Sequence, residues 1–348
     1  MRLSAVGDVV NTLPAISAVR EAFPGARIAY LVEDKAREVV EGHPDLDETI
    51  VFPKREWRGR VLSPATWNAA AEHVRRIRAG RFDVLVDFQG NLKGGLHAAL
   101  SGIPVRIGFA RGHCKEGSHR FTNRHVAPPS ERVLRARKFL ALLAPLGIDS
   151  PRVVWRLPPR AESERRVGAW LGEAGLGDGG FLLVHPGSSA VEPQKRWPAE
   201  RFAELARRAE TELGMPTLVA WGPGERPLAE AIAHDSRATI AMESRSLHDL
   251  AEMLARARIY VGADSGPQHL ASAVGVPAVA LHGERDPAIY APCNPRSRFL
   301  RGFLEDGTPS TLAIGVDEVF EAARSVLAEA GATPPGAGRG PARDALPA

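Results

Sequence analysis

Small and cationic residues follow a strand-like run in the second half of this chain. The apolar run 180–187 leads into HPGSSAVEPQKRWP (185–198), which contains Ser188, Ser189 and Lys195 ahead of a helical pattern. Small residues let backbone amides approach a phosphate, a helix N-terminus favours an anion, and a lysine neutralises the phosphate charge. A solvated polar loop would have the same composition, so this segment alone leaves a phosphate site and a surface loop equally open.

A second turn, within GADSGPQHLASAVGVP (262–277), is more specific. It places a small polar cluster where a strand meets a helix, namely Asp264, Ser265, Gly266, Pro267 and His269. The amides at this helix start and the serine hydroxyl would form a second anion site facing the first. The alternatives are that Asp264 or Ser265 is an ordinary N-cap and that His269 is a packed structural residue.

A third turn, WGPGE (221–225), ends another strand-like run with an acid. Glu225 is suited to accept hydrogen bonds from ribose or sugar hydroxyls, or to complement a helix dipole. None of these turns contains GxGxxG or GxxxxGK[ST], which argues against nicotinamide dinucleotides and P-loop ATP hydrolysis. No cluster has metal-ligand spacing, so neither a metal nor a cofactor is predicted. A diphosphate held without a metal needs cations and amides, and these turns supply both.

The first half of the chain carries one acidic turn and two basic loops. Asp8 stands in GDVVNTLP (7–14), where we expect a turn before a helix, and DFQGNLKGG (87–95) contains Gln89 and Lys93. The two basic loops, 53–60 and 110–125, include Arg58, Arg60, Lys115 and Arg120. Such charges are usually solvated surface. Two such clusters flanking one cleft are better explained by the binding of an acidic acceptor. The alternative is that these basic loops attach the protein to anionic lipid headgroups.

Short β-rich runs alternate with amphipathic segments along the chain. Strands are expected at 26–33, 48–53, 81–89, 104–109, 180–187, 216–222, 258–266 and 277–283. Helices are expected at 12–22, 34–42, 64–79, 91–101, 131–146, 198–214, 246–257, 265–274 and 316–330. This α/β alternation is typical of parallel sheets covered on both faces, with ligands at the carboxyl ends of the strands.

The periodicity lapses near the Pro-rich stretch 153–163, which marks a domain boundary. We therefore expect two α/β domains, 1–155 and 156–331, followed by a disordered tail of Pro, Gly and Ala at 332–348.

The composition excludes several classes of protein. The 348 residues are 44% hydrophobic and 25% charged with a net charge of +4, as in soluble globular proteins. No apolar run approaches the roughly 18 residues of a membrane span. The two cysteines have neither disulfide nor metal spacing, which favours a reducing, cytoplasmic compartment. Aromatic residues make up only 6% of the chain, which argues against a nucleic-acid binder that stacks bases on aromatic rings.

The linked motifs resemble those of glycosyltransferase family 9, the bacterial ADP-heptose:lipopolysaccharide heptosyltransferases. The resemblance covers residues 2 to about 330 and rests on RLSAVGDVVNTLPAISAVREAFP, FDVLVDFQGNLKGG, HPGSSAVEPQKRWPAERFAELA, VAWGPGE and GADSGPQHLASAVGVPAVALHGERDP, in the family's order. The opening GDVVNTLP is most like that of heptosyltransferase I members. The resemblance implies an α/β GT-B fold, in which two facing Rossmann-like, doubly wound domains enclose a central cleft. It also implies an inverting transfer that needs no bound metal.

The resemblance further implies ligands and a location. The donor is an ADP-activated sugar, ADP-heptose, held mainly by the C-terminal domain. The acceptor is the anionic, lipid-linked Kdo-lipid A inner core of lipopolysaccharide, held by the N-terminal domain. No cofactor and no nucleic acid are implied. The enzyme would work in the cytoplasm, in transient contact with the inner-membrane surface.

Site residues follow from the resemblance position by position. Asp8 falls on the family's general base. The donor set is Ser188, Ser189 and Lys195 at the phosphates, Glu225 near the ribose, and Asp264, Ser265, Gly266, Pro267 and His269 in the D-[ST]-G-x-x-H stretch. The acceptor set is Gln89 and Lys93 in the family's QGxxK motif, Lys115 near a basic position, and Arg58, Arg60 and Arg120 in the basic loops.

Two departures from the family pattern leave alternatives open. Pro267 stands where heptosyltransferase I usually has leucine, so the donor sugar is not settled. The first strand is short, Arg2 to Ala5, and we expect the natural start to lie several residues upstream. The alternatives are a family 9 transferase with another nucleotide-sugar donor or glycan acceptor, a sugar-nucleotide epimerase on the same scaffold, and a non-catalytic ligand-sensing protein.

Overall fold

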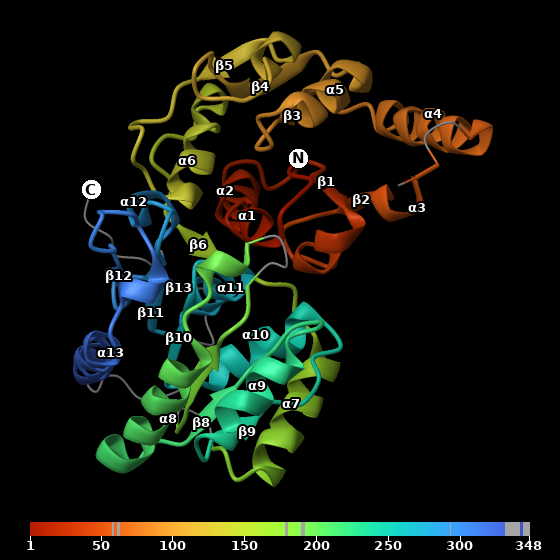
Figure 1. Ribbon diagram of the computed structural model, residues 1–348. Helices are drawn as coiled ribbons and strands as arrows, with labels where there is room; N and C mark the ends of the chain where they lie inside the picture. Colours follow the sequence, from red (N-terminus) through yellow and green to blue (C-terminus); the bar gives the residue numbers. More distant parts are fainter. Residues whose placement is uncertain are drawn as a thin grey trace. The chain divides into compact units, whose positions relative to one another are not determined.

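The chain divides into two compact units, Met1–Pro158 and Pro159–Ala348, and each is described by itself (Figure 1). The computed structural model describes residues 1–57, 59–60, 63–177, 180–188, 192–292, 294–330 and 342–343. The predicted tail 332–348 lies outside these residues except for the two-residue strand β13 (Ala342–Arg343). Within the described part of the chain, no helix is both long and apolar enough to cross a membrane.

The second unit contains a six-stranded parallel sheet. In spatial order its strands are β12 (Arg298–Arg301), β11 (Ala278–His282), β10 (Ile259–Ala263), β7 (Leu182–His185), β8 (Thr217–Val219) and β9 (Thr239–Ile240). If β7 is counted as strand 1 and β12 as strand 6, the order read from the β9 edge is 3-2-1-4-5-6. This is the strand order of dinucleotide-binding folds, whose ligands bind where the order reverses. Every residue of β7, β10 and β11 is buried, because helices cover both faces of the sheet.

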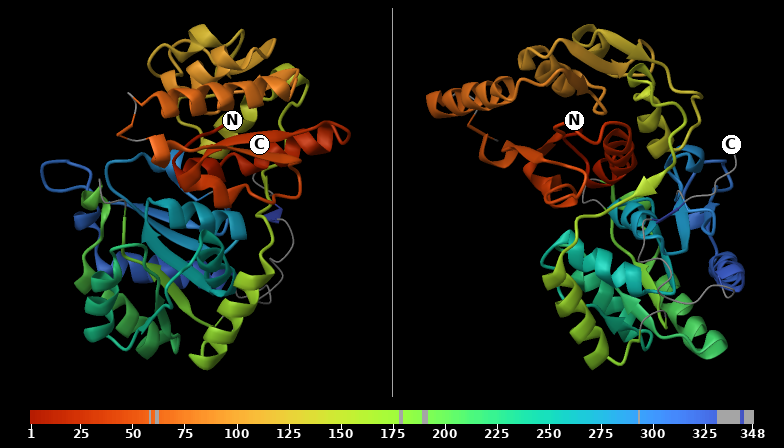
Figure 2. Two further views of the ribbon diagram at one scale, coloured as in Figure 1. Left: turned by 90° about the vertical axis from the view of Figure 1, so that its right-hand side faces the viewer. Right: turned by 180° about the vertical axis from the view of Figure 1, so that it is seen from behind.

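Two groups of helices cover this sheet (Figure 2). One group packs α8 (Ala199–Leu213) between α9 (Arg226–His234) and α13 (Val316–Ala330). The other packs α10 (Leu247–Arg256) between α7 (Ala161–Glu173) and α11 (Gly266–Val274). Short elements complete the unit: η4 (Pro193–Lys195), α12 (Pro287–Tyr290) and η5 (Thr311–Ala313).

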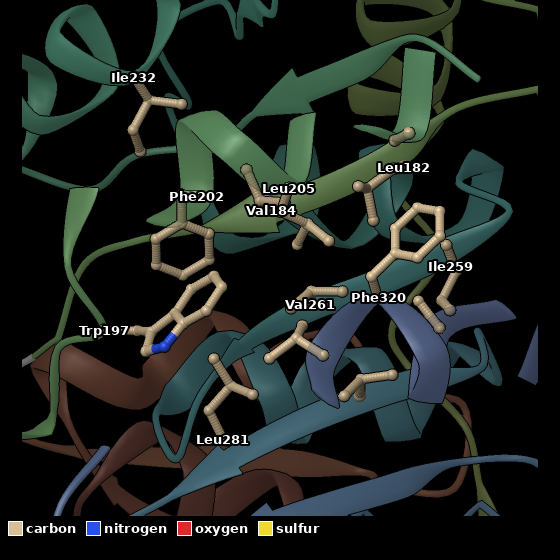
Figure 3. Packing of buried hydrophobic residues seen from close by; sticks show 14 of the residues in the cluster. Leu182, Val184, Trp197, Phe202, Leu205, Ile232, Ile259, Val261, Leu281 and Phe320 are labelled. Atoms are coloured by element: carbon tan, nitrogen blue, oxygen red, sulfur yellow. The ribbon is translucent and has the colours of Figure 1, made fainter. Parts of the chain in front are cut away.

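The main core of this unit lies between the sheet and the α8 group. Trp197 and Phe202 pack edge to face with ring centroids 4.8 Å apart, as Figure 3 shows at one end of the cluster. The indole Nε1 of Trp197 donates to the carbonyl of Ile314 at 2.9 Å, so its polar group is satisfied in the core. This contact anchors the segment between Lys195 and α8.

The first unit repeats the same strand order with a shorter first strand. Its assigned strands are β1 (Ala29–Glu33), β2 (Glu48–Phe52), β3 (Val84–Val86), β4 (Val105–Phe109) and β5 (Arg124–Val126), paired in parallel as β1–β2 and β3–β4–β5. Residues 1–3 join the two groups. The Arg2 amide donates to Leu31 O at 3.3 Å, and the Met1 amino group donates to Val86 O at 2.8 Å. With this segment as first strand, the order is again 3-2-1-4-5-6.

The helices of the first unit differ from the expected ones in several places, and the predicted basic loops 53–60 and 110–125 contain the short helices α3 and η2. The unit contains α1 (Val6–Val10), α2 (Leu13–Ala22), η1 (Asp34–Val39), α3 (Lys54–Trp57), α4 (Pro64–Ala79), α5 (Leu92–Ser101), η2 (Ser118–Phe121), α6 (Arg135–Ala141), η3 (Ala144–Leu146) and the short strand β6 (Val154–Trp155). The predicted helix 34–42 is a 3₁₀ helix that ends at Val39, and the predicted helix 131–146 is divided into α6 and η3. The predicted turn at Asp8 is wrong, because Asp8 lies inside α1.

Candidate active site

Two loops of the second unit meet where the strand order reverses, between β7 and β10. Ser188 follows β7, and Asp264 directly follows β10. The Lys195 ammonium, from the segment after β7, lies 3.5 Å from the Asp264 carboxylate. Both residues are buried, although they are 69 positions apart in sequence. The structure thus brings together predicted donor residues from two separate motifs.

A balanced network of charges surrounds this contact. Lys195 Nζ lies 2.9 Å from Glu192 Oε2, and Arg285 lies 2.9 Å from Glu192 Oε1 and 3.5 Å from Asp264 Oδ2. Burial opposes ionisation of Glu192, but Lys195 and Arg285 together lower its pKa. Two cations and two carboxylates therefore face one another in one network.

The hydroxyl of Ser188 is held at the edge of this network. It donates to the Glu192 carbonyl at 2.9 Å and accepts from the Arg196 guanidinium at 3.2 Å. Arg196 thus adds a third cation beside Lys195. The predicted partner Ser189 lies outside the described residues.

The helix α11 begins two residues after Asp264. Ser265 is the N-cap residue in extended conformation, and its side chain makes no capping hydrogen bond. Pro267 lies in that turn, where a missing N–H matters least. The uncapped amides that begin at Gly266 are suited to an anion. His269 Nε2 lies 3.9 Å from Asp264 Oδ1, so the histidine borders the same group.

Glu225 lies against the loop after β7. Its Oε2 accepts from the Gly222 amide at 2.9 Å and lies 3.4 Å from His185 Nε2. Burial lowers the pKa of His185, which Glu225 opposes, so the imidazole is neutral at pH 7. A Cβ added at Gly187 would overlap the Glu225 carboxylate. The Glu225 carboxylate can therefore keep this position beside the loop after β7 only if residue 187 is a glycine.

In the first unit, Asp8 lies at the corresponding place, where the strand order of the sheet reverses. Asp8 is in α1, directly after the first strand segment, and its carboxylate pairs with Arg2 and lies 3.2 Å from Arg135 Nε. Arg2 also donates to the carbonyls of Phe88 at 2.8 Å and Gln89 at 3.1 Å, after β3. The Asp8 carboxylate is therefore held in place from two sides by guanidinium groups.

Gln89 and Lys93 support the segment that leads to Asp8. The Gln89 Oε1 accepts from the amides of Leu3 at 3.0 Å and Ser4 at 3.4 Å. The Lys93 ammonium lies 3.4 Å from Ser4 Oγ and pairs with Glu33, a carboxylate that is only 4% exposed. Lys93 is therefore neutralised by an acid rather than being a free anion-binding cation.

The remaining predicted acceptor residues are less closely connected. Lys115 is exposed, and its amide donates to Gly90 O at 2.8 Å, which places its loop beside the Gln89 turn. Arg60 and Arg120 are exposed. Arg58 lies outside the described residues.

Several residues of both sites were not identified from the sequence. Arg2 and Arg135 hold Asp8, Glu33 pairs with Lys93, and Arg285 with Glu192 completes the network in the second unit. Arg285 lies within the quoted GERDP segment, so its motif was visible although its role was not. The Glu33–Lys93, Glu192–Arg285 and Asp8–Arg135 pairs span 60 or more positions, and such pairing depends on strand order, which cannot be read from local patterns.

His282 is a further buried group beside the donor network. It ends β11 and is fully buried, with no hydrogen-bond partner for either ring nitrogen among the described residues. Burial lowers its pKa to about 4, so the ring is neutral at pH 7.

Comparisons with known proteins identify the family of the chain. The chain matches glycosyltransferase family 9 (heptosyltransferase) over residues 70–310. It is 29% identical over 291 residues to lipopolysaccharide heptosyltransferase 1 of Pseudomonas aeruginosa, covering 82% of this chain and 78% of that protein.

Solved structures show the same fold. The glycosyl transferase family 9 protein of Veillonella parvula superposes with a TM-score of 0.79 at 25% identity, covering 94% of this chain and 95% of that one. The Escherichia coli heptosyltransferase WaaC, solved with ADP, superposes with a TM-score of 0.77 at 21% identity over 93% and 98% of the two chains. The predicted GT-B fold class is confirmed, and this glycosyltransferase belongs to glycosyltransferase family 9.

Proposed function

We propose that this enzyme moves a heptose from ADP-heptose to the Kdo-lipid A inner core of lipopolysaccharide, with inversion at the anomeric carbon and without a catalytic metal. The observation that carries the proposal is a correspondence between the two units. Asp8 lies where the strand order of the first unit reverses, and the Lys195–Asp264 pair lies where the strand order of the second unit reverses. The names of the relatives support heptose as the sugar and ADP as the nucleotide.

The second unit would bind the donor. Lys195, Arg285 and Ser188, with the open amides at the start of α11, would hold the diphosphate and stabilise the charge that grows on ADP as it leaves. Glu225 would accept hydrogen bonds from the ribose, and Asp264 would bind the sugar hydroxyls. Ser189, Pro267 and His269 complete this donor set by the family pattern.

Asp8 would be the general base. As the acceptor hydroxyl attacks the anomeric carbon, the bond to the ADP oxygen breaks and Asp8 takes the hydroxyl proton. Arg2 and Arg135 would hold the carboxylate in one orientation, which keeps its oxygen aimed at that proton. Attack from the face opposite the leaving group accounts for the proposed inversion.

The basic surface of the first unit would bind the acceptor. Lys115, Arg60 and Arg120 are exposed and suited to carboxylates and phosphates, with Arg58 from the same loop as Arg60. Gln89 and Lys93 would support the acceptor site by holding the segment before Asp8. Because the acceptor is lipid-linked, we place the reaction at the cytoplasmic face of the inner membrane.

The test is a reaction of the purified enzyme with ADP-heptose and Kdo-lipid A in the presence of EDTA. We expect mass spectrometry to show the addition of one heptose with release of ADP, and NMR to show inverted anomeric configuration. GDP-, UDP- and dTDP-sugars are the matched donors and should react more slowly. Epimerisation of a sugar nucleotide without any acceptor, or transfer only after a divalent metal is restored, would contradict the proposal.

A further inference from the structure

An apolar pocket in the first unit is separate from the charged groups around Asp8. It has a volume of about 460 Å³, within the range of about 300–1,000 Å³ typical of small-molecule sites. It lies between α4 and α5, beside the end of β2 and α3, and its apolar wall includes Phe52, Trp57, Val74, Leu92, Leu96 and Leu100. We call it the α4–α5 pocket.

The wall formed by α5 is unusually apolar for an exposed helix face. Leu92, Leu96 and Leu100 recur every four residues, so they form one stripe along the helix. These three side chains are 41%, 45% and 49% exposed and yet line the pocket. An apolar stripe that opens into a cavity marks a surface for an apolar ligand rather than ordinary solvent-facing helix.

The wall formed by β2, α3 and α4 is aromatic, and His97 of α5 packs against it. Phe52 packs edge-on against Trp57 and His97, each with ring centroids 4.9 Å apart, and His73 lies 5.8 Å from His97. Burial, followed by the neighbouring His97, lowers the pKa of His73 to about 4, and burial lowers the pKa of His97. Both imidazoles are therefore neutral at pH 7, so the charged side chains that line the pocket are Lys93 and Glu116.

Lys93 connects this pocket with the predicted acceptor site. Its side chain lines the pocket, while its ammonium pairs with Glu33 and lies 3.4 Å from Ser4 Oγ, in the segment that leads to Asp8. On the other side, α3 carries Lys54 and Arg55 within one turn of Trp57. Lys54 pairs with the same Glu33 at 3.3 Å, so one buried carboxylate holds both lysines at the rim of the cavity. Through Lys93 the cavity adjoins the segment that leads to Asp8, an arrangement that suits a hydrocarbon chain attached to a polar acceptor group.

We infer that the α4–α5 pocket binds one acyl chain of the lipid-linked acceptor while the acceptor sugar lies near Asp8. This inference rests on the proposed function, because it assumes an acceptor that carries acyl chains. Each buried methylene favours binding, so the pocket would make the enzyme prefer the acylated acceptor over the same sugar after deacylation.

The first test fills the pocket. Ala70 lines it, whereas its neighbour Ala71 is on the exposed side of α4 and does not. We expect the wild-type enzyme to have a kcat/KM at least about tenfold higher for acylated than for deacylated acceptor, which is about 1.4 kcal/mol. Ala70→Trp should bring this ratio close to one, and Ala71→Trp should keep the wild-type ratio. A wild-type ratio of one, or equal changes in both variants, would overturn the inference.

The second test needs no turnover and uses Trp57 as the probe. Acceptor lipid with brominated acyl chains should quench the fluorescence of Trp57, and this part of the quenching should disappear in Trp57→Phe and weaken in Ala70→Phe, which fills the pocket without adding a tryptophan. Vesicles of brominated phosphatidylglycerol without acceptor are the comparison. Equal quenching by these vesicles would assign the pocket to membrane lipid and overturn the inference. If heptose transfer itself fails, the proposed function fails, while the quenching result still decides the occupant of the pocket.

Discussion

Replacement of Gly187 by alanine tests how the loop after β7 places Glu225. The added Cβ would overlap the Glu225 carboxylate, so this side chain must move. In moving it loses the 2.9 Å hydrogen bond from the Gly222 amide and its 3.4 Å contact with His185. A hydrogen bond to a charged group contributes about 1.5–3 kcal/mol, so if Glu225 binds the donor ribose, ADP affinity should fall about 10- to 100-fold.

The assay is isothermal titration calorimetry with ADP. Gly172→Ala is the matched control, because Gly172 lies in α7 of the same unit and a Cβ there meets nothing within 4 Å. A double-mutant cycle sharpens the result. In a Glu225→Ala background, Gly187→Ala should cost no further affinity, since the displaced side chain is gone. Wild-type ADP affinity in Gly187→Ala, or losses that simply add in the double variant, would refute this reasoning.

Three other substitutions probe the second unit. Lys195→Ala should weaken ADP binding about 10- to 100-fold by removing a buried cation from the phosphate site, and an unchanged Kd would contradict that role. Trp197→Ala should lower the free energy of unfolding by about 3–5 kcal/mol, measured with urea, because it empties a core position; a loss below about 1 kcal/mol would contradict the core assignment. The pKa of His282 is lowered to about 4 in the folded protein. Between pH 6.5 and pH 4 the unfolded chain therefore binds more protons than the folded protein, and the free energy of unfolding decreases as the pH falls. By pH 5 this amounts to about 2 kcal/mol, at 1.36 kcal/mol for each of 1.5 pH units below 6.5, and His282→Leu should remove that part of the decline in urea unfolding; equal pH dependence in both proteins would contradict it.

Elements with a strong period and clear end signals could be predicted from the sequence. The predicted helix 64–79 coincides with α4, and the predicted helix 198–214 differs from α8 by one residue at each end. Both begin at or just after a proline, and α8 is followed by Gly214 in the left-handed conformation, so local chemistry determines their limits.

Other elements could not be predicted because their local signals are weak or conflicting. Helix α7 begins inside the Pro-rich stretch that was interpreted as a boundary, and α9 was not predicted, with a proline in its first turn. Strand β9 has only two residues, too few for a period to appear. The short helix α1 was interpreted as a turn because Gly7 and Asp8 are common in turns.

For the candidate site, the residues in local motifs could be predicted from the sequence, but their distant partners could not. Asp8, Lys195 and Asp264 lie in motifs that the sequence displays, and their segments were identified correctly as following strands. The partners of these residues come from elsewhere: Arg135 lies 127 positions after Asp8, and Arg285 lies 93 positions after Glu192. Such pairs form because parallel strands bring their carboxyl ends to one edge, which only the strand order reveals.

The most direct test of the account is the separation of donor binding from chemistry in Asp8→Asn. If Asp8 is the base of the first unit and the donor is held by the second, this variant should bind ADP like the wild type. Its rate of heptose transfer should fall about 10²- to 10⁴-fold, the usual contribution of a general base. Asp83→Asn, at an exposed carboxylate just before β3, is the control and should keep the wild-type rate. A near-wild-type transfer rate in Asp8→Asn would contradict the account.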